Sequence, residues 1–275
     1  MATESVEWNR DLEIGIPFID ADHRTLISLL NQVAACVAAN EETLTVGSVL
    51  NSLDDYVRLH FGREESLQEA CGYPGLAAHR NQHQELCRRL DGVRQRFHAD
   101  PAQVSLGDVH RLLKDWFARH IQAEDIPLRE HCAANREAIA RAAAMRLGGD
   151  GPDWSQRRIL VLDDNPNFTR LVETVLAAIG VGTVYTAGTA REAMAHLARH
   201  NVDLILVDWV MDDTDGLDFV RGLKRDGIPC PTIMVTGYAR TDYRTKAMAA
   251  GVSGILEKPI SARALVRAMG EALAK

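Results

Sequence analysis

Hydrophobic residues in the first half of the chain recur every three or four positions, the spacing of a helix with one buried face. Four such stretches cover residues 21–40, 47–71, 76–97 and 105–125. Turn-forming or capping residues separate them, as in GYPG at 72–75 and ADPAQVS at 99–105. Four long helices with short connections predict an all-α antiparallel four-helix bundle over residues 1–132.

From residue 158 the pattern changes to short β-rich runs that alternate with helical segments. The runs are residues 158–164, 183–187, 202–208, 231–237 and 253–259. This alternation over residues 158–275 predicts an α/β doubly wound domain, in which helices cover both faces of a parallel five-stranded sheet. Between the halves, residues 133–147 predict a connecting helix and GGDGPD at 148–153 a break, so we expect a helical connector and linker over 133–157.

The length of 275 residues agrees with two domains, because one hydrophobic core rarely covers so many. No apolar run approaches the roughly 20 residues that span a bilayer. The first residues are acidic, whereas a signal peptide would be basic and then apolar. Five scattered cysteines without a CxxC pair favour reduced thiols. Together these features predict a cytoplasmic protein that does not contact a membrane.

The charge distribution excludes a strongly basic surface. The net charge is −7, and residues 1–149 hold 22 acidic against 16 basic side chains, while residues 158–275 hold 14 of each. Contacts with a phosphate backbone require a basic excess. We therefore expect no nucleic-acid partner.

Histidines and carboxylates follow the predicted helices of the first half. His60 and Glu64 are four residues apart on the second helix, and His79 and His83 are four apart on the third, so each pair shares one stripe of its helix. A single histidine on an amphipathic helix is usually a surface or core residue, but polar residues from all four helices are typical of a metal site in a bundle. The set is His23, His60, Glu64, His79, His83, His120 and Asp125.

The chemistry of these side chains narrows the choice of metal. Imidazoles and carboxylates without a thiolate favour iron or manganese over structural zinc. Seven ligands are too many for one ion and suit two. If both carboxylates and one further oxygen bridge, all but one of the roughly 12 positions of two octahedral ions are filled. The open position could take a diatomic ligand.

Residues 1–132 resemble a bacterial hemerythrin domain. The matching motifs are Trp8, DADH at 20–23, HFxxEE at 60–65, YPGLAAHRNQH at 73–83 and HIxxxD at 120–125. The resemblance implies a non-haem di-iron centre with an oxo or hydroxo bridge that binds O₂ reversibly. It also implies that all seven side chains are iron ligands, with Glu64 and Asp125 bridging.

Spacing alone would not pair His120 with Asp125. The two are five residues apart, about 140° around a regular helix. We hypothesise that Pro127, which lacks a backbone donor, marks a local distortion that lets both side chains reach inward.

Other polar and aromatic residues near these motifs have simpler interpretations. Phe117, one turn before His120, is interpreted as a core residue beside the open position, and Glu65 as an exposed helix acid. The remaining histidines are interpreted as solvated or incidental: His98, His110, His131, His196 and His200.

Carboxylates close two strands of the second half. Asp163 and Asp164 follow the first strand, and Asp208 ends the third. The carboxyl ends of parallel strands meet at one edge of the sheet, where three carboxylates would attract a divalent cation such as Mg²⁺. Thr236 and Lys258 close the fourth and fifth strands. A hydroxyl and an ammonium beside a metal-bound carboxylate form a site for a phosphoryl group.

Residues 158–275 resemble the receiver domain of response regulators, of the chemotaxis type. The resemblance implies a flavodoxin-like sheet of strand order 2-1-3-4-5. It implies that Asp208 is the phosphoacceptor, that Thr236 and Lys258 contact the phosphate, and that Gly216 is the family's turn glycine. The implied Mg²⁺ ligands are Asp163, Asp164, Asp208 and the backbone carbonyl of Val210. The Lys258–Pro259 bond is expected to be cis.

Two positions depart from the receiver pattern. Asp212 stands where the family has proline, and Ile255 stands where it has Phe or Tyr. The family's aromatic side chain swings inward when the threonine engages the phosphate, and Ile255 cannot make the hydrogen bond of a phenol. Tyr238 could take part of that role, although simple exposure is the plainer interpretation.

These features predict a two-component signalling protein. An O₂-binding or redox-sensing di-iron domain would be coupled, through the connecting helix, to a receiver phosphorylated on Asp208 by a separate histidine kinase or phosphotransfer protein. The output would pass to an unknown downstream protein, a dimer through the receiver is allowed, and no enzymatic activity is expected. Alternative interpretations are an oxygen or iron store tethered by its receiver, and a di-iron enzyme acting on peroxide or nitric oxide.

Overall fold

The computed structural model describes residues 5–149, 151–212, 214–237 and 241–274. The chain divides into two compact units, Met1–Gly149 and Asp150–Lys275. Within the described residues, none of the helices combines the length and the apolar character that crossing a bilayer requires.

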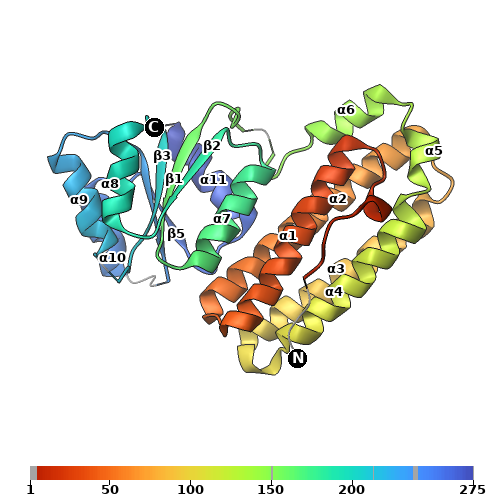
Figure 1. Ribbon diagram of the computed structural model, residues 1–275, viewed down its shortest axis with the longest axis horizontal. Helices are drawn as coiled ribbons and strands as arrows, with labels where there is room; N and C mark the ends of the chain where they lie inside the picture. The colour runs from red at the N-terminus through yellow and green to blue at the C-terminus, as the bar shows by residue number, and fades with distance from the viewer. Residues whose placement is uncertain (1–4, 150, 213, 238–240, 275) are drawn as a thin grey trace. The chain divides into compact units, whose positions relative to one another are not determined.

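The first unit is a bundle of four long helices, as predicted. They are α1 (Pro17–Ala39), α2 (Thr43–Cys71), α3 (Leu76–Ala99) and α4 (Leu106–His120). Helix α2 packs against α1 and α3, and α1 also packs against α4 (Figure 1). Local chemistry sets the helix ends: Asn40 and Gly72 end α1 and α2 in the left-handed conformation, and the Ser105 side chain caps α4. Short 3₁₀ turns, η1 (Arg10–Leu12) and η2 (Pro101–Gln103), flank the helices.

The fourth helix does not stay regular to its end. Residues Ile121–Asp125 form a π-helical turn, η3, in which the Ile126 amide donates to the Ile121 carbonyl at 3.0 Å. The hypothesised distortion near Pro127 is therefore confirmed, and it occupies the last turn of the helical stretch predicted over residues 105–125. Two short helices follow, α5 (Leu128–Cys132) and α6 (Arg136–Ala144), and α6 packs along α2.

The second unit is a parallel five-stranded sheet of order β2-β1-β3-β4-β5, which confirms the predicted fold. Helices α7 and α11 cover one face, and α8, α9 and α10 cover the other (Figure 1). The elements are β1 (Arg158–Leu162), α7 (Pro166–Ala178), β2 (Thr183–Ala187), α8 (Ala190–Arg199), β3 (Leu204–Asp208), α9 (Gly216–Arg225), β4 (Thr232–Thr236), α10 (Thr241–Ala250), β5 (Gly254–Glu257) and α11 (Ala262–Leu273).

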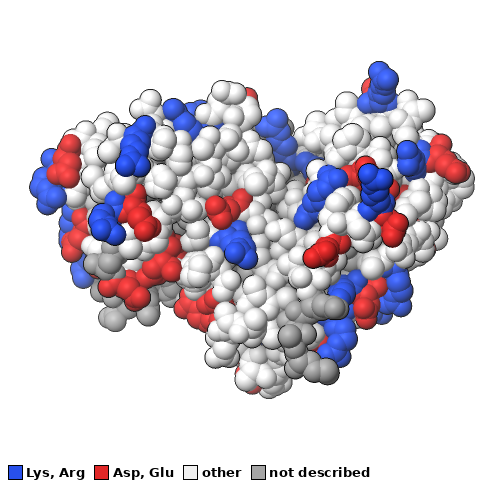
Figure 2. All heavy atoms as spheres, in the orientation of Figure 1, with Lys and Arg blue, Asp and Glu red and all other residues white. Residues whose placement is uncertain are grey.

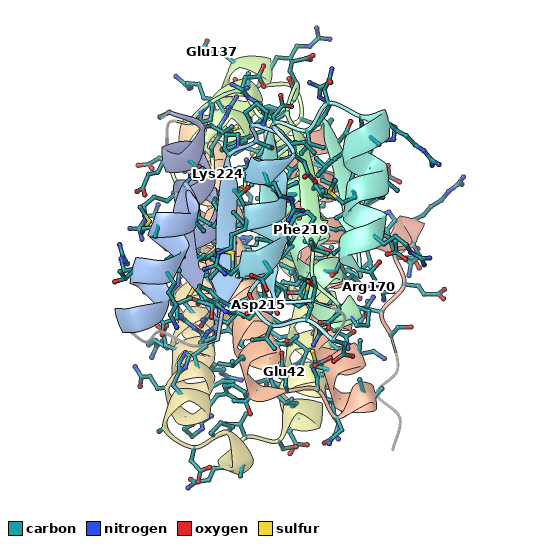
Figure 3. All side chains as sticks on the ribbon, turned by 90° about the vertical axis from the view of Figure 1, so that its left-hand side faces the viewer. Glu42, Glu137, Arg170, Asp215, Phe219 and Lys224 are labelled. Carbon is teal, nitrogen blue, oxygen red and sulfur yellow. The ribbon has the colours of Figure 1, made fainter. Side chains whose placement is uncertain are left out.

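The central strands and α9 fix the carboxyl edge of the sheet. Every residue of β3 and β4 is buried, as expected for strands covered on both faces. Helix α9 begins at this edge, where Asp215 caps it through the Leu217 amide, and it runs away toward Lys224 (Figure 3). Phe219 on the inner side of α9 packs into the core. The buried strand ends and the capped start of α9 thus fix the backbone at the carboxyl edge of the sheet.

Candidate metal centre and acidic pocket

The seven predicted ligand side chains of the bundle lie together in its interior. None of the seven residues is more than 4% exposed. They form two groups, each with ligand atoms within 4.8 Å of one another: Glu64, His79, His83 and His120 in the first, and His23, His60 and Asp125 in the second. Helices α1, α2 and α3 contribute with the end of α4 and the π turn, so the bundle assembles what the sequence holds far apart.

The two carboxylates lie between these groups. Glu64 is 3.3 Å from His79 Nε2 and 3.6 Å from His60 Nε2, and therefore contacts a member of each group. Asp125 is 3.2 Å from His120 Nε2 and 3.4 Å from His23 Nε2, and therefore also contacts a member of each group. A carboxylate with one oxygen toward each group is placed to bridge two cations.

Burial and mutual contact decide how these groups ionise. Burial lowers the pKa of His60, and lowers that of His83 to about 3, so both imidazoles are neutral at neutral pH. Burial, with Asp125 nearby, raises the pKa of Glu64 well above its usual range. Burial also acts to raise the pKa of Asp125, but the surrounding imidazoles, His120 first, bring it well below its usual value. Neutral imidazoles are the form that binds metals.

The donor atoms fit a bound metal. Nε2 of His120 lies 3.1 Å from Nε2 of His79 and 3.0 Å from Nε2 of His83, so three ring nitrogens converge on one space. Within the described part of the chain, the ring nitrogens of His23 and His60 and the oxygens of Asp125 have no hydrogen-bond partner. Such buried polar atoms cost free energy unless something pairs them. Cations shared by this nitrogen and oxygen set would satisfy them, and the set suits iron.

The acidic pocket of the second unit lies at the carboxyl edge of the sheet. Ligand oxygens of Asp163, Asp164 and Asp208 lie within 4.8 Å of one another. Lys258 Nζ is 2.9 Å from Asp163 and 3.0 Å from Asp208, and it lies 3.9 Å from the centre of the Phe168 ring. The lysine thus offsets part of the repulsion between the acids.

Burial also sets the ionisation of the pocket. It raises the pKa of Asp163 to about 6 and raises that of Asp208, although Lys258 opposes both shifts. Burial alone would lower the pKa of Lys258, but the two carboxylates raise it, so the ammonium keeps its charge. Thr236, at the end of β4, is 2% exposed, and its carbonyl accepts from the Lys258 amide at 2.7 Å. The arrangement offers a carboxylate, an ammonium and a hydroxyl at one edge.

Comparison with known proteins identifies both units. The hemerythrin HHE cation binding domain family matches residues 14–128, and the response regulator receiver domain family matches residues 159–270. Bacteriohemerythrin of Stenotrophomonas maltophilia is 33% identical over 134 residues, which are 49% of this chain and 86% of that protein. Chemotaxis protein CheY of Pseudomonas aeruginosa is 31% identical over 110 residues, 39% of this chain and 89% of that protein. The chain belongs to the hemerythrin and response-regulator receiver families.

One solved structure aligns with the receiver part of the chain. The CheY-like receiver domain protein of Methanospirillum hungatei is 28% identical, with a TM-score of 0.40 over 43% of this chain and 94% of that one. The two family matches and the curated relatives, rather than this structure, support a signalling fusion that joins a metal- and oxygen-binding hemerythrin domain to a receiver. Domains of both kinds are typically binding and signalling modules.

Polar side chains that the sequence analysis did not assign to the site contact the predicted ligands of the hemerythrin domain. Nδ1 of His83 lies 2.9 Å from Glu65, so the interpretation of Glu65 as an exposed acid is wrong. Gln68 on α2 lies 3.2 Å from Nδ1 of His79, and Gln82 on α3 lies 3.3 Å from Nδ1 of His120. Partners of this kind orient a metal-ligating ring. Helical spacing already puts Gln68 one turn from Glu64, but the contacts between helices leave no such signal.

Asp22 is a fourth such residue, on α1. Its Oδ2 lies 3.7 Å from Nδ1 of His60, and its Oδ1 accepts from Arg63 at 2.7 Å. Burial acts to raise the pKa of Asp22, but His60 and Arg63 bring it below its usual value. Its position in the DADH motif, directly before His23, was the available sequence signal.

An apolar cavity of about 30 Å³ lies in the core of the hemerythrin domain. Phe61 and Phe117 line it, and Phe61 stacks on His83 while Phe117 meets His23 edge-on at 5.3 Å. The other lining residues are Leu26, Leu30, Leu53, Val57, Leu86, Leu113 and Trp116. A small apolar space that reaches the aromatic rings beside the ligands can hold a small neutral molecule.

The histidines outside the ligand set differ in their surroundings. His98, His131 and His200 are exposed, in agreement with a solvated position. Of the two interpretations given for His110, solvated or incidental, the first is wrong, because His110 is 2% exposed. It lies on the inner stripe of α4, beside Val109 and three residues before Leu113, both buried.

The structure of the receiver accounts for the glycine at position 216 and for the aspartate at position 212, where the family has proline. A Cβ on Gly216 would lie 2.0 Å from the backbone oxygen of Asp208, so no larger residue fits there. Asp212 and Asp215 are exposed, and Figure 2 shows acidic atoms gathered at the lower end of the receiver. The Asp212 amide donates to Asp164 at 2.7 Å, which a proline could not do.

The other receiver residues considered in the sequence analysis lie at or near the ends of strands. Val210 is 56% exposed beside the pocket, and the Lys258–Pro259 peptide is cis, as predicted. Ile255 is half-buried and packs against the core on the side of α9 and α10. Tyr238, for which exposure was the plainer interpretation and a share of the aromatic role the alternative, lies outside the described residues.

Proposed function

We propose that this protein is a two-component signalling protein in which a non-haem di-iron hemerythrin domain senses O₂ or redox state and controls a receiver phosphorylated on Asp208. The observation that carries the proposal is the convergence of seven buried donor side chains in one domain, in a chain whose other domain holds an acidic pocket with a buried lysine. We assign residues 1–132 to sensing, 133–157 to the connector and linker, and 158–275 to the receiver.

In the sensing domain, His79, His83 and His120 would hold one iron, and His23 and His60 the other. Glu64 and Asp125 would bridge them. When bound, the iron pair would supply reversible binding of a diatomic ligand. The chain's own contribution is to keep His60 and His83 neutral and to surround the site with apolar side chains that limit access of water. Glu65, Gln68 and Gln82 would orient the rings that they contact.

In the receiver, Asp163, Asp164, Asp208 and the Val210 carbonyl would hold Mg²⁺. An Asp208 oxygen would attack the phosphorus of a phosphohistidine on the partner kinase or phosphotransfer protein. A new O–P bond forms, the P–N bond breaks, and the released imidazole takes up a proton from solvent. Lys258, already 3.0 Å from Asp208, would then meet the phosphoryl oxygens with its positive charge, and Thr236 would donate its hydroxyl to them.

The output of this protein would be a contact with another protein rather than turnover of an external substrate. The phosphorylated edge of the receiver would present an altered surface to that partner. The free energy of ligand binding in the bundle can influence that surface only if the two sites are energetically coupled.

The test compares phosphorylation of Asp208 in the full chain, with acetyl phosphate as donor, for metal-free, deoxygenated iron-loaded and oxygenated protein. We expect two irons per chain, an O₂-dependent absorption spectrum, and a phosphorylation rate that differs between oxygenated and deoxygenated protein. Equal rates in all three states would contradict the coupling. Rapid autoxidation favours sensing, slow autoxidation favours storage, and turnover of added peroxide favours an enzyme.

Two matched variants make the test specific. Glu64→Gln, which removes a bridging carboxylate, should abolish both iron loading and the oxygen-dependent rate. Glu69→Gln, five residues later on the same helix with a side chain 73% exposed, should change neither. Asp208→Asn should abolish phosphorylation and leave the iron spectrum intact.

A further inference from the structure

Arg63 on α2 joins the end of α6 to the interior of the hemerythrin domain. Its Nε donates to the Met145 carbonyl at 2.8 Å, and its Nη2 donates to the carbonyls of Met145 and Ala143. These carbonyls belong to the last turn and cap of α6, where a helix has acceptors without internal partners. A cation there is favoured by the helix dipole as well as by the hydrogen bonds.

The third guanidinium nitrogen of Arg63, Nη1, points into the domain. Its Nη1 donates to Oδ1 of Asp22 at 2.7 Å, and the side chains of Arg63 and Asp22 are 12% and 2% exposed. The attraction between two charges is stronger where water is largely excluded, and the hydrogen bond between them fixes their relative orientation. One guanidinium therefore binds a buried carboxylate and a helix end at the same time, which its planar fork allows and a lysine would not.

Asp22 in turn meets a proposed iron ligand. Its Oδ2 faces Nδ1 of His60 at 3.7 Å, and among the residues that the structure describes neither atom has a hydrogen-bond partner. An imidazole that offers Nε2 to a metal carries its proton on Nδ1, where a carboxylate commonly accepts it. The two unpaired atoms are thus placed to pair when Nε2 of His60 is engaged.

We propose that Asp22 and Arg63 form a positioning relay through which occupancy of the iron site sets how firmly the end of α6 is held against α2. Engagement of His60 fixes its proton toward Asp22, the carboxylate is then held from both sides, and Arg63 is oriented over the carbonyls of Ala143 and Met145. Helix α6 lies directly before the connection to the receiver, which begins at residue 150 in the chain. This inference rests on the proposed function of the bundle.

Amide hydrogen exchange of the full chain, read by mass spectrometry on peptides covering residues 136–149, tests the relay. The quantity compared is the ratio of exchange rates in metal-free and Fe(II)-loaded protein, measured without oxygen. We expect iron to slow exchange by about fivefold in the unchanged chain. In Arg63→Gln the ratio should fall to about one, although iron still binds, because no arm reaches both Asp22 and the helix end.

Three further variants separate a relay from a purely structural role. Asp22→Asn keeps the bonds from Arg63 to α6 but removes the charge between His60 and Arg63, so it too should lose the iron-dependent ratio. Arg63→Lys should lose it as well, since one ammonium cannot serve both partners. Arg58→Gln is the matched control: Arg58 lies on α2 but binds Asp54 and Asp91, so the ratio should stay as in the unchanged chain.

The possible results are distinguishable. A ratio that remains unchanged in Arg63→Gln and Asp22→Asn overturns the relay, as does a ratio of one in an unchanged chain that binds iron. A chain that binds no iron overturns the proposed function and the relay together.

Discussion

Seven ionisable side chains share a space from which water is nearly excluded, and this sets their chemistry. Burial keeps His60 and His83 neutral and opposes charge on Glu64. Buried charges are costly unless they are paired, so ionisation of both Glu64 and Asp125 in this space requires positive charge beside them. The same reasoning applies to the receiver, where Lys258 supplies part of that charge.

Residue ionisation predicts the pH dependence of Mg²⁺ binding. Burial raises the pKa of Asp163 to about 6, so a proton competes with the cation below that pH. We expect the Mg²⁺ affinity of the receiver to weaken as pH falls, by up to about tenfold for each unit below about 6, and to change little above about 7. Calorimetric titration with Mg²⁺ at several pH values measures it. A flat affinity between about pH 5 and 7 would contradict the role of Asp163.

At the scale of elements, the π turn solves the spacing of His120 and Asp125. Five residues in a regular helix would place them about 140° apart, but the wider turn brings both side chains into the cluster, where Asp125 is fully buried. A single extra residue in an otherwise α-helical stretch is enough for this.

Deleting Ala123, an exposed residue of the π turn, should therefore leave a regular helix with the carboxylate four positions after His120, about 40° away. We expect such a chain to retain iron. Inserting one alanine after Ala123 would put the carboxylate six positions after His120, about 120° around a regular helix and about 9 Å along it, and should abolish loading. Iron per chain, by elemental analysis, gives the answer. Loss of iron in the deletion variant together with retention in the insertion variant would contradict this role of the π turn.

Helix α9 offers a matched pair of glycines for testing the phosphoacceptor loop. Gly216→Ala would force a Cβ against the Asp208 backbone oxygen and should destabilise the receiver by about 2 kcal/mol or more. Gly222→Ala, in the interior of the same helix with its nearest neighbour at 3.7 Å, should stabilise it by up to about 1 kcal/mol. Urea unfolding, with the receiver transition identified by its shift with Mg²⁺, measures both. Equal effects would show that the close approach is relieved by local movement.

Most of the fold and of the two candidate sites could be predicted from the periodicity of the sequence, and particular residues show why. His60 with Glu64 and His79 with His83 are one turn apart, and the strand ends place Asp163 and Asp208 together, so local geometry suffices for them. Asp125 needed the family resemblance, because the π turn leaves no periodic signal. Contacts between helices are not encoded in spacing, which is why Asp22, Glu65, Gln68 and Gln82 went unnoticed as partners of the ligands.

For the whole molecule, the separation into two units predicts a selective response to metal removal. Chelation of iron would leave the seven donors of the bundle unpaired, whereas the receiver keeps its own core. We expect the bundle transition in calorimetry to lose about 4 kcal/mol or more of stabilisation, for iron at about a thousand times its dissociation constant. The receiver transition should shift far less. A chelator that moved both equally would indicate one cooperative unit.

The proposed ligand set runs from His23 to Asp125 and draws on every long helix of the bundle. A chain emerging from the ribosome therefore has no complete cage for iron until the π turn has been synthesised and folded back against α1. Iron would therefore bind late in biogenesis, and a chain that has bound iron is one whose whole bundle has already folded.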